Sequence, residues 1–143
     1  MAFIVNGNEF LINGDTYFFN GKHRSKNSHG SQWTIDLKQE LSLMNDSLSN
    51  NYIELINNNS KLSQSYNFFK VNNKLKSVGL DNERQEELIL CKYVETSNKL
   101  WHGYPGNYCK NNQDRPNETT LKNMLNNSLI TKKEMSKISK GQR

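Results

Sequence analysis

The residue types best suited to chemistry lie together in one short segment, Trp101-His102-Gly103-Tyr104-Pro105. An imidazole and a phenol on a backbone shaped by glycine and proline are groups that loops use for binding and for proton transfer. Tyr108 follows shortly afterwards, and Arg115 is close enough in sequence to hold an anion beside His102. The segment therefore predicts a binding site, although aromatic residues of this kind also anchor loops in a protein core.

The same residues suggest a catalytic alternative. A metal-independent ribonuclease needs a proton acceptor for the 2′-hydroxyl and a cation for the charge that develops on the phosphorane. His102 would be the acceptor and Arg115 the cation, with Tyr104 nearby. His23 and His29 flank a polar loop, which would supply a second base if the fold brings this loop to His102.

The net charge of +5 comes from one end of the chain. Residues 122–143 hold six cations against Glu134 alone, and the rest of the chain is neutral. Such an end attracts phosphates or acidic partners, although it can equally be the solvated face of a helix. We include four lysines in the predicted binding surface: Lys132, Lys133, Lys137 and Lys140.

A DNA-binding regulator is a further alternative, because two helices close the chain and their spacing is compatible with a helix-turn-helix. The last of these helices has no arginine, and reading of base edges depends strongly on arginine, asparagine and glutamine. Contact with phosphates therefore fits these residues better than sequence reading.

Other classes of protein find little support. Cys91 and Cys109 have a spacing that fits no zinc or redox motif, and we predict no metal and no cofactor. The N-terminus lacks a secretion signal, and no apolar run approaches the ~18 residues of a membrane span. We therefore expect a cytoplasmic protein, in its own cell or a host cell, with no membrane partner. The many asparagines and lysines suggest an AT-rich bacterial or phage genome.

The most regular element is a seven-residue repeat over residues 3–23. Asn6-Gly7 and Asn13-Gly14 stand between apolar runs, and Asn-Gly is the strongest short-range signal for a β-hairpin. The repeat predicts an antiparallel β-meander in which Phe3, Phe10 and Tyr17 form one cross-strand row. Apolar residues on both faces predict that each face is covered at least in part; an exposed aromatic face that stacks nucleic-acid bases is the alternative.

The remaining chain gives weaker signals. Residues 33–37 alternate as a possible fourth strand, and residues 41–80 show apolar spacing that suggests helices. Residues 88–94 fit either a helix or a buried strand. Glycine and proline exclude a regular helix over residues 101–118. Helices are predicted near 118–126 and from the N-cap Thr131, with a capping box closed by Glu134 and a C-terminal Gly141.

These patterns predict a single α+β domain. Its parts are a β-meander of three or four short strands (1–40), a mainly helical segment (41–100), an aromatic Gly/Pro loop (101–118) and a basic helical hairpin (119–143). The favoured function is a non-enzymatic binding protein that docks onto a macromolecular partner, protein or nucleic acid, through the aromatic loop and the basic C-terminus.

Overall fold

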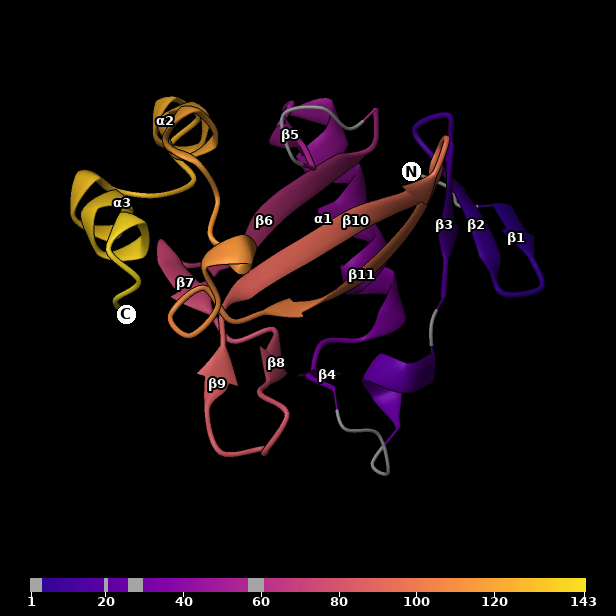
Figure 1. Ribbon diagram of the computed structural model, residues 1–143, viewed down its shortest axis with the longest axis horizontal. Helices are drawn as coiled ribbons and strands as arrows, with labels where there is room; N and C mark the ends of the chain where they lie inside the picture. Colours follow the sequence, from indigo (N-terminus) through magenta and orange to yellow (C-terminus); the bar gives the residue numbers. More distant parts are fainter. Residues whose placement is uncertain (1–3, 20, 26–29, 57–60) are drawn as a thin grey trace.

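The fold is mixed α+β, with a large central sheet and helices on both of its faces (Figure 1). The computed structural model describes residues 4–19, 21–25, 30–56 and 61–143. In chain order the elements are β1 (Ile4–Asn6), β2 (Glu9–Ile12), β3 (Asp15–Phe18), the 3-10 helix η1 (Gly21–Arg24), β4 (Gln32–Trp33), α1 (Leu37–Ser49), β5 (Ile53–Leu55), β6 (Ser63–Val71), β7 (Lys74–Lys76), β8 (Gly79–Leu80), β9 (Glu87–Leu88), β10 (Leu90–Ser97), β11 (Leu100–Gly106), the 3-10 helix η2 (Asn112–Asp114), α2 (Glu118–Asn126) and α3 (Lys132–Ser139).

Among the described residues, the central sheet has eight strands in the order β1-β2-β3-β11-β10-β6-β5, with β7 paired to β6. All of its pairings are antiparallel except that of β3 with β11, which is parallel. A second sheet of three short strands has the order β4-β8-β9. Within the described ranges, no helix has the length and apolar character needed to cross a bilayer.

The N-terminal strands β1, β2 and β3 pair in sequence order through two short turns. At the second turn Asn13 and Gly14 both have positive φ, at 53° and 85°, as a type I′ hairpin turn requires. The first turn differs from the prediction, because Asn6 pairs with Glu9 and the loop is residues 7–8. Gly7, with φ of 64°, takes the first loop position, where glycine meets no steric penalty.

The two faces of these strands have different environments. Phe10 and Tyr17 are opposite each other, as predicted, and both are buried in the core beneath α1. Because they are buried, they are not available to stack bases. On the other face Leu11 and Phe18 are 47% and 40% exposed, so this face is covered only in part. Phe3 lies outside the described residues, but Phe10 is opposite Val5 in the pairing of β1 with β2, so the predicted pairing of Phe3 with Phe10 is wrong.

The predicted strand over residues 33–37 is only partly present. Trp33 belongs to β4, which pairs with β8 in the small sheet and not with the N-terminal strands. Asp36 instead caps α1, since its side chain accepts a hydrogen bond from the backbone N–H of Gln39. A capped helix start satisfies a backbone donor that would otherwise have no partner, and this favours the helix from Leu37 onwards.

The prediction that residues 41–100 are mainly helical is wrong. Within the described part of that segment α1 is followed by strands, including the long strands β6 and β10. In β6 the residues alternate: Tyr66 and Phe68 lie in one core cluster, whereas Ser65 and Asn67 hydrogen bond to α1 on the other face. This is the period of two expected for a strand, which the helical spacing of the larger residues concealed.

Asparagine-rich turns explain the remaining hairpins. Asn72 and Asn73, between β6 and β7, have φ of 51° and 64°, and asparagine tolerates this left-handed region better than most residues. Asp81 lies in the β8–β9 turn, where its carboxylate accepts the N–H groups of Gln85 and Glu86. The segment that fitted either a helix or a strand belongs to β9 and β10.

Residues 101–106 belong to strand β11, so the predicted loop begins only after them. Pro105 is compatible with this strand because the pairing of β11 with β3 ends at Trp101, which leaves an edge where a missing N–H does little harm. The C-terminal helices begin after the caps Asn117 and Thr131. At the end of α3, Gly141 has φ of 69° and completes a Schellman motif.

The buried apolar residues form two clusters, one on each face of the central sheet. Side chains of α1 pack with Tyr17, Tyr93 and Trp101 on one face. On the other face α2 and α3 pack with Tyr66, Phe68 and further residues. Figure 1 shows α1 crossing behind the sheet. The helices α2 and α3 lie beside β6 and β7, at the end of the sheet away from β1.

Candidate functional site: a histidine-lined cavity

A cavity of about 620 Å³ lies where η1, β11, the β8–β9 turn and the loop after β11 meet. This volume is within the usual range for ligand sites. The cavity contains His102 and Tyr104 from the segment that the sequence singled out, together with His23. His23 lies near His102 because β3 and β11 are parallel. Both strands run towards the same end of the sheet, so η1, which follows β3, lies beside the last residues of β11. His29 lies outside the described residues.

Three rings form a row along one wall of the cavity. The centroids of the His23 and Tyr104 rings are 5.4 Å apart with an interplanar angle of 24°. The His102 ring is 6.4 Å from Tyr104 at an angle of 30°. Residues 102 and 104 share a face of β11 because alternate residues of a strand point the same way. The condition set at the sequence level is therefore met: the fold brings His23 to the segment that holds His102.

The hydrogen bond of His23 fixes its tautomer. Its Nδ1 lies 2.8 Å from the carbonyl oxygen of Ser31, and a carbonyl only accepts, so Nδ1 carries the hydrogen. In the neutral ring the lone pair is then on Nε2. Burial lowers the pKa of His23 below 6.5; the bond to Ser31 raises the pKa and the charge of Lys22 lowers it.

His102 is half-buried and differs from His23 in its hydrogen bonding. Within the part of the chain that the structure describes, its ring makes no hydrogen bond, and its ring contact is with Tyr104. Burial lowers the pKa of His102 below 6.5, and the nearby His23 and Lys22 lower it further. Both imidazoles are therefore neutral at pH 7, which is the form that accepts a proton.

A buried ion pair between Lys92 and Asp114 holds Tyr104, the middle ring of the row, in place. Nζ of Lys92 lies 3.0 Å from Oδ1 of Asp114, and both side chains are buried. The Tyr104 hydroxyl donates to the same carboxylate oxygen at 3.0 Å, and the N–H of Asn107 donates to Oδ2 at 3.0 Å. Burial and the Asp114 charge raise the pKa of Tyr104, so it remains a protonated phenol. Asp114 therefore fixes both the tyrosine ring and the loop after β11.

The lowered histidine pKa values predict a pH dependence of stability. In the unfolded chain each imidazole has its ordinary pKa near 6.5, so the unfolded state binds more protons below that pH. The free energy of unfolding is therefore expected to fall as pH decreases from 7.5 to 5.5. Urea unfolding across this range should show a smaller decrease for His102→Asn than for the natural protein. An unchanged decrease would mean that His102 is solvated in the folded state.

The other predicted site residues lie elsewhere. Trp101 is buried, and its Nε1 donates to Asp15 at 2.8 Å. Tyr108 is buried in the cluster beneath α2 and α3, and its hydroxyl donates to the carbonyl of Gln142. These two aromatic residues are anchors of the core, the alternative left open by the sequence, and they do not offer a docking surface.

Arg115 is not beside His102, so the predicted pairing of the two is wrong. Its guanidinium donates to the carbonyl oxygen of Tyr108 at 3.1 Å and packs against Gly141 at the end of α3. η2 and the following residue turn the chain away from the cavity, which places Asp114 in its wall and Arg115 outside it. The cations that line the cavity are instead Lys22 and Lys110.

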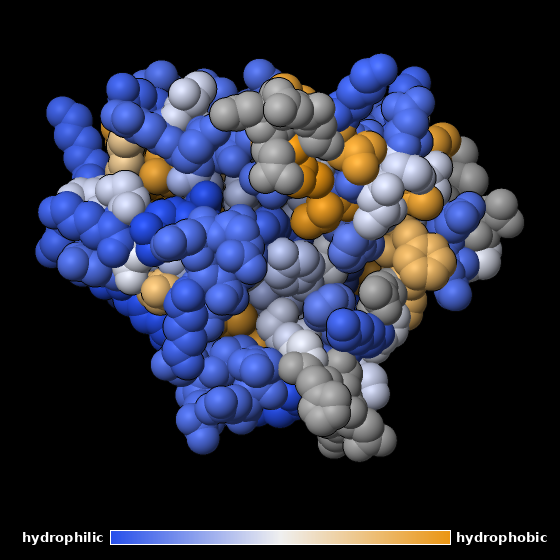
Figure 2. All heavy atoms as spheres, in the orientation of Figure 1, coloured by the Kyte–Doolittle hydropathy of each residue, from blue (hydrophilic) through white to orange (hydrophobic). Residues whose placement is uncertain are grey.

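The lysines of α3 and its C-terminal end form a second charged region. Lys132, Lys133 and Lys140 are exposed, while Lys137 is half-buried and lines a smaller cavity of about 300 Å³. Figure 2 shows hydrophilic residues gathered on the left, over α2 and α3, and hydrophobic residues mainly at the upper right. The predicted basic surface is therefore accessible, in contrast to the predicted aromatic one.

Sequence reasoning missed Lys92 and Asp114, the charged pair under the ring row. A signal was present, because Lys92 interrupts the apolar run of residues 88–94. A lysine on the inward face of a buried strand requires a partner, and this requirement predicts a carboxylate nearby. Only the fold identifies Asp114 as that carboxylate. Among the described residues no cluster of three or more His, Cys, Asp or Glu side chains is placed to bind a metal ion.

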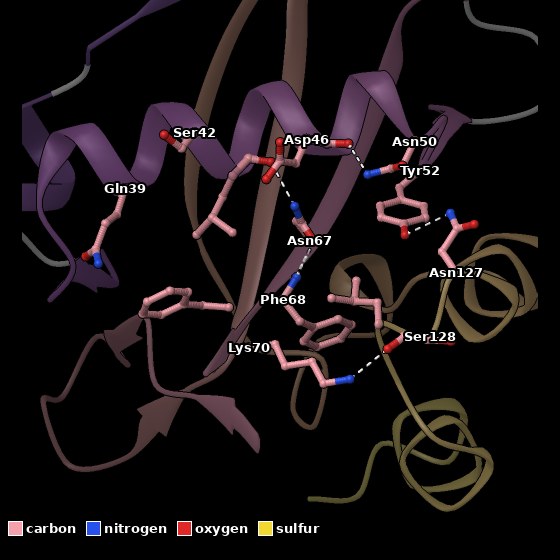
Figure 3. A pocket seen from close by; sticks show the side chains of 13 residues that line it. Gln39, Ser42, Asp46, Asn50, Tyr52, Asn67, Phe68, Lys70, Asn127 and Ser128 are labelled. Atoms are coloured by element: carbon pink, nitrogen blue, oxygen red, sulfur yellow. Dashed lines mark hydrogen bonds between the residues drawn. The ribbon is translucent and has the colours of Figure 1, made fainter. Parts of the chain in front are cut away.

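A cavity of about 440 Å³ between α1, β6 and the α2–α3 connection is a less suitable site (Figure 3). Three of its amide and ammonium groups join the walls to one another. Asn67 donates to the Leu43 carbonyl, and Lys70 donates to the Ser128 carbonyl at 2.7 Å. Asn127 donates to the Tyr52 hydroxyl. Because these polar groups hold the elements together, the cavity is a seam between them.

The fold and the site together define a small α+β protein in which strand β11 forms one wall of a histidine-lined cavity. Comparison with known protein families, with curated proteins and with solved structures finds no match to this chain.

Proposed function

We propose that this protein binds nucleic acid through the phosphate backbone, with α3 as the main contact. The observation that carries the proposal is the position of the net charge. All of the +5 comes from residues 122–143, and the lysines of α3 and its C-terminal end, Lys132, Lys133 and Lys140, are exposed. Lysines that neutralise phosphates release condensed counterions, which gives binding that does not depend on sequence.

A phosphate backbone is favoured over an acidic protein partner by the composition of α3. Its outward residues are lysines and serines, whereas protein interfaces are enriched in aromatic residues, methionine and arginine. Lysine acts towards phosphate as a flexible point charge and needs no fixed geometry from the partner. The sequence suggested that an aromatic loop also contacts the partner. Because Trp101 and Tyr108 are buried, the aromatic rings left for such a contact are those that line the cavity.

A salt series tests this proposal. The variant carries Lys→Gln at residues 132, 133, 137 and 140, and it is compared with a control that carries Lys→Gln at Lys38, Lys61, Lys76 and Lys99, all exposed and all outside α3. Both changes lower the net charge equally. We expect single-stranded RNA to bind the α3 variant at least about ten-fold more weakly, with a salt slope shallower by about 0.7 for each lost contact.

The control variant should bind nearly as the natural protein does. Equal loss of affinity in the two variants would show that overall charge, and not α3, determines binding. Absence of a gel shift for both RNA and duplex DNA at low salt would overturn the proposal and direct the search to a protein partner.

A further inference from the structure

We infer that the cavity holding His23 and His102 is a catalytic site that cleaves single-stranded RNA by attack of the 2′-hydroxyl on the neighbouring phosphate. The inference rests on the proposed function, since α3 would hold the strand that the cavity cleaves. Two imidazoles in one cavity are the groups that such a reaction uses as base and acid.

His23 is suited to the role of base. Its Nδ1–H donates to the Ser31 carbonyl, so Nε2 is the nitrogen that takes the proton. Stacking on Tyr104 fixes the plane of the ring, and Tyr104 is itself held by Asp114. A ring held from two sides keeps its nitrogen in one position, and this lowers the entropic cost of reaching the transition state.

His102 is suited to the role of acid. Its ring lines the same cavity and makes no hydrogen bond within the described residues, so a protonated nitrogen can face the leaving group. Lys22 and Lys110 also line the cavity and would attract the phosphate.

Two of the carboxylates in the cavity wall already have partners within the protein. Asp114 is paired with Lys92, and Asp81 accepts two backbone N–H groups. Glu83, in the β8–β9 turn, is exposed. The carboxylates of Asp114 and Asp81 therefore compete less with the phosphate for the cavity lysines than free carboxylates would.

The step balances without water or another reactant. Nε2 of His23 takes the proton of the 2′-hydroxyl, and the 2′ oxygen forms a bond to phosphorus. The bond from phosphorus to the 5′ oxygen breaks, and the protonated His102 gives its proton to that oxygen. The products are a 2′,3′-cyclic phosphate and a 5′-hydroxyl. Exchange of protons with solvent then restores both imidazoles.

Glu86 connects the basic C-terminal end of the chain with the cavity wall by two ion pairs. Glu86 forms ion pairs with Lys110, at 3.7 Å, and with Arg143, at 3.1 Å. Lys110 lines the cavity, and Arg143 follows the end of α3. Lys110 in the cavity wall therefore lies near Arg143 at the end of α3, with the Glu86 carboxylate between them partly neutralising both cations.

The test uses the full chain with labelled single-stranded RNA in EDTA at pH 6, and with 2′-O-methyl RNA of the same sequence to measure binding alone. His23→Asn retains an amide donor for the Ser31 carbonyl but lacks the base. We expect His23→Asn and His102→Asn each to cleave at least about 100-fold more slowly and to bind 2′-O-methyl RNA unchanged. The natural protein should yield 2′,3′-cyclic phosphate ends, with a rate maximum below pH 6.5.

Each other result has a separate meaning. Binding without cleavage by the natural protein overturns the inference but leaves the proposed function intact. Equal cleavage by the histidine variants, purified in the same way, overturns it as well, because the activity would then lie outside this cavity. Cleavage that the α3 lysine variant retains in full would support the catalytic site and refute α3 as the contact. If either asparagine variant fails to fold by circular dichroism, the glutamine variant at the same position takes its place.

Discussion

Asp114→Ala is expected to lower the free energy of unfolding by about 3–5 kcal/mol, because it leaves the buried Lys92 ammonium without its charged partner and with only the Gln113 carbonyl as acceptor. Lys92 and Asp114 are 3.0 Å apart, with side chains only 4% and 6% exposed. The same change removes the acceptor for the Tyr104 hydroxyl and for the Asn107 N–H. Each buried donor left unsatisfied adds to the loss. Urea unfolding at pH 7.5 measures the difference.

Two further variants separate the causes. Lys92→Met removes the buried cation but leaves Asp114 with its three other donors, the Tyr104 hydroxyl, the Asn107 N–H and the Asn111 amide, so we expect a smaller loss than for Asp114→Ala. Lys122→Met removes a cation from an exposed pair with Glu118, at 3.2 Å, and should change stability by only about 0.5 kcal/mol. If Asp114→Ala were as mild as Lys122→Met, the pair would have to be hydrated in solution, and the support of the ring row would need another explanation.

The contrast between these ion pairs reflects what the sequence could and could not predict. Lys122 and Glu118 are four residues apart in one helix, and that helix, like α3, is determined by local signals such as the caps Asn117 and Thr131. Local signals are readable because their partners are close in sequence. The Asn13-Gly14 turn was predictable for the same reason.

The central strands depend on partners far away in the chain. The spacing of Tyr66 and Phe69 suits a helix, while Tyr66 and Phe68 suit a strand, and only pairing with β10 and β5 decides between them. The overlooked local signal was Asn72-Asn73, a hairpin turn concealed by the general abundance of asparagine. Where many asparagines are present, their positions between apolar runs carry information that their number does not.

The site itself is an outcome of long-range pairing. His23 and His102 meet because β3 lies parallel to β11, and nothing local to either histidine indicates that pairing. From the sequence, His23 could be proposed as a second base only if the fold brought its loop to His102, and the sequence does not determine whether it does. Arg115 shows the reverse error, since closeness in sequence to His102 suggested closeness in space. A 3-10 helix between them was sufficient to send the arginine to α3.

Gly103→Ala is expected to destabilise the protein by about 3 kcal/mol, at the upper end of the usual cost of overfilling a core. A Cβ atom at residue 103 would lie 2.5 Å from the Tyr17 hydroxyl oxygen and 2.5 Å from Cδ1 of Tyr93. Neither ring is free to move away. The Tyr17 hydroxyl donates to the Glu40 carboxylate, and the Tyr93 hydroxyl donates to the Glu40 carbonyl, at the buried face of α1.

Gly21→Ala is the matched control, because a Cβ there meets no atom of the described residues within 4 Å and should alter stability by no more than about 0.5 kcal/mol. Thermal unfolding followed by circular dichroism measures both variants, and a Gly103→Ala protein as stable as Gly21→Ala would contradict the packing described. Gly103 lies between His102 and Tyr104, with its missing side chain on the face of β11 turned towards α1. The strand can therefore carry two site residues on one face only because glycine admits two tyrosine rings on the other.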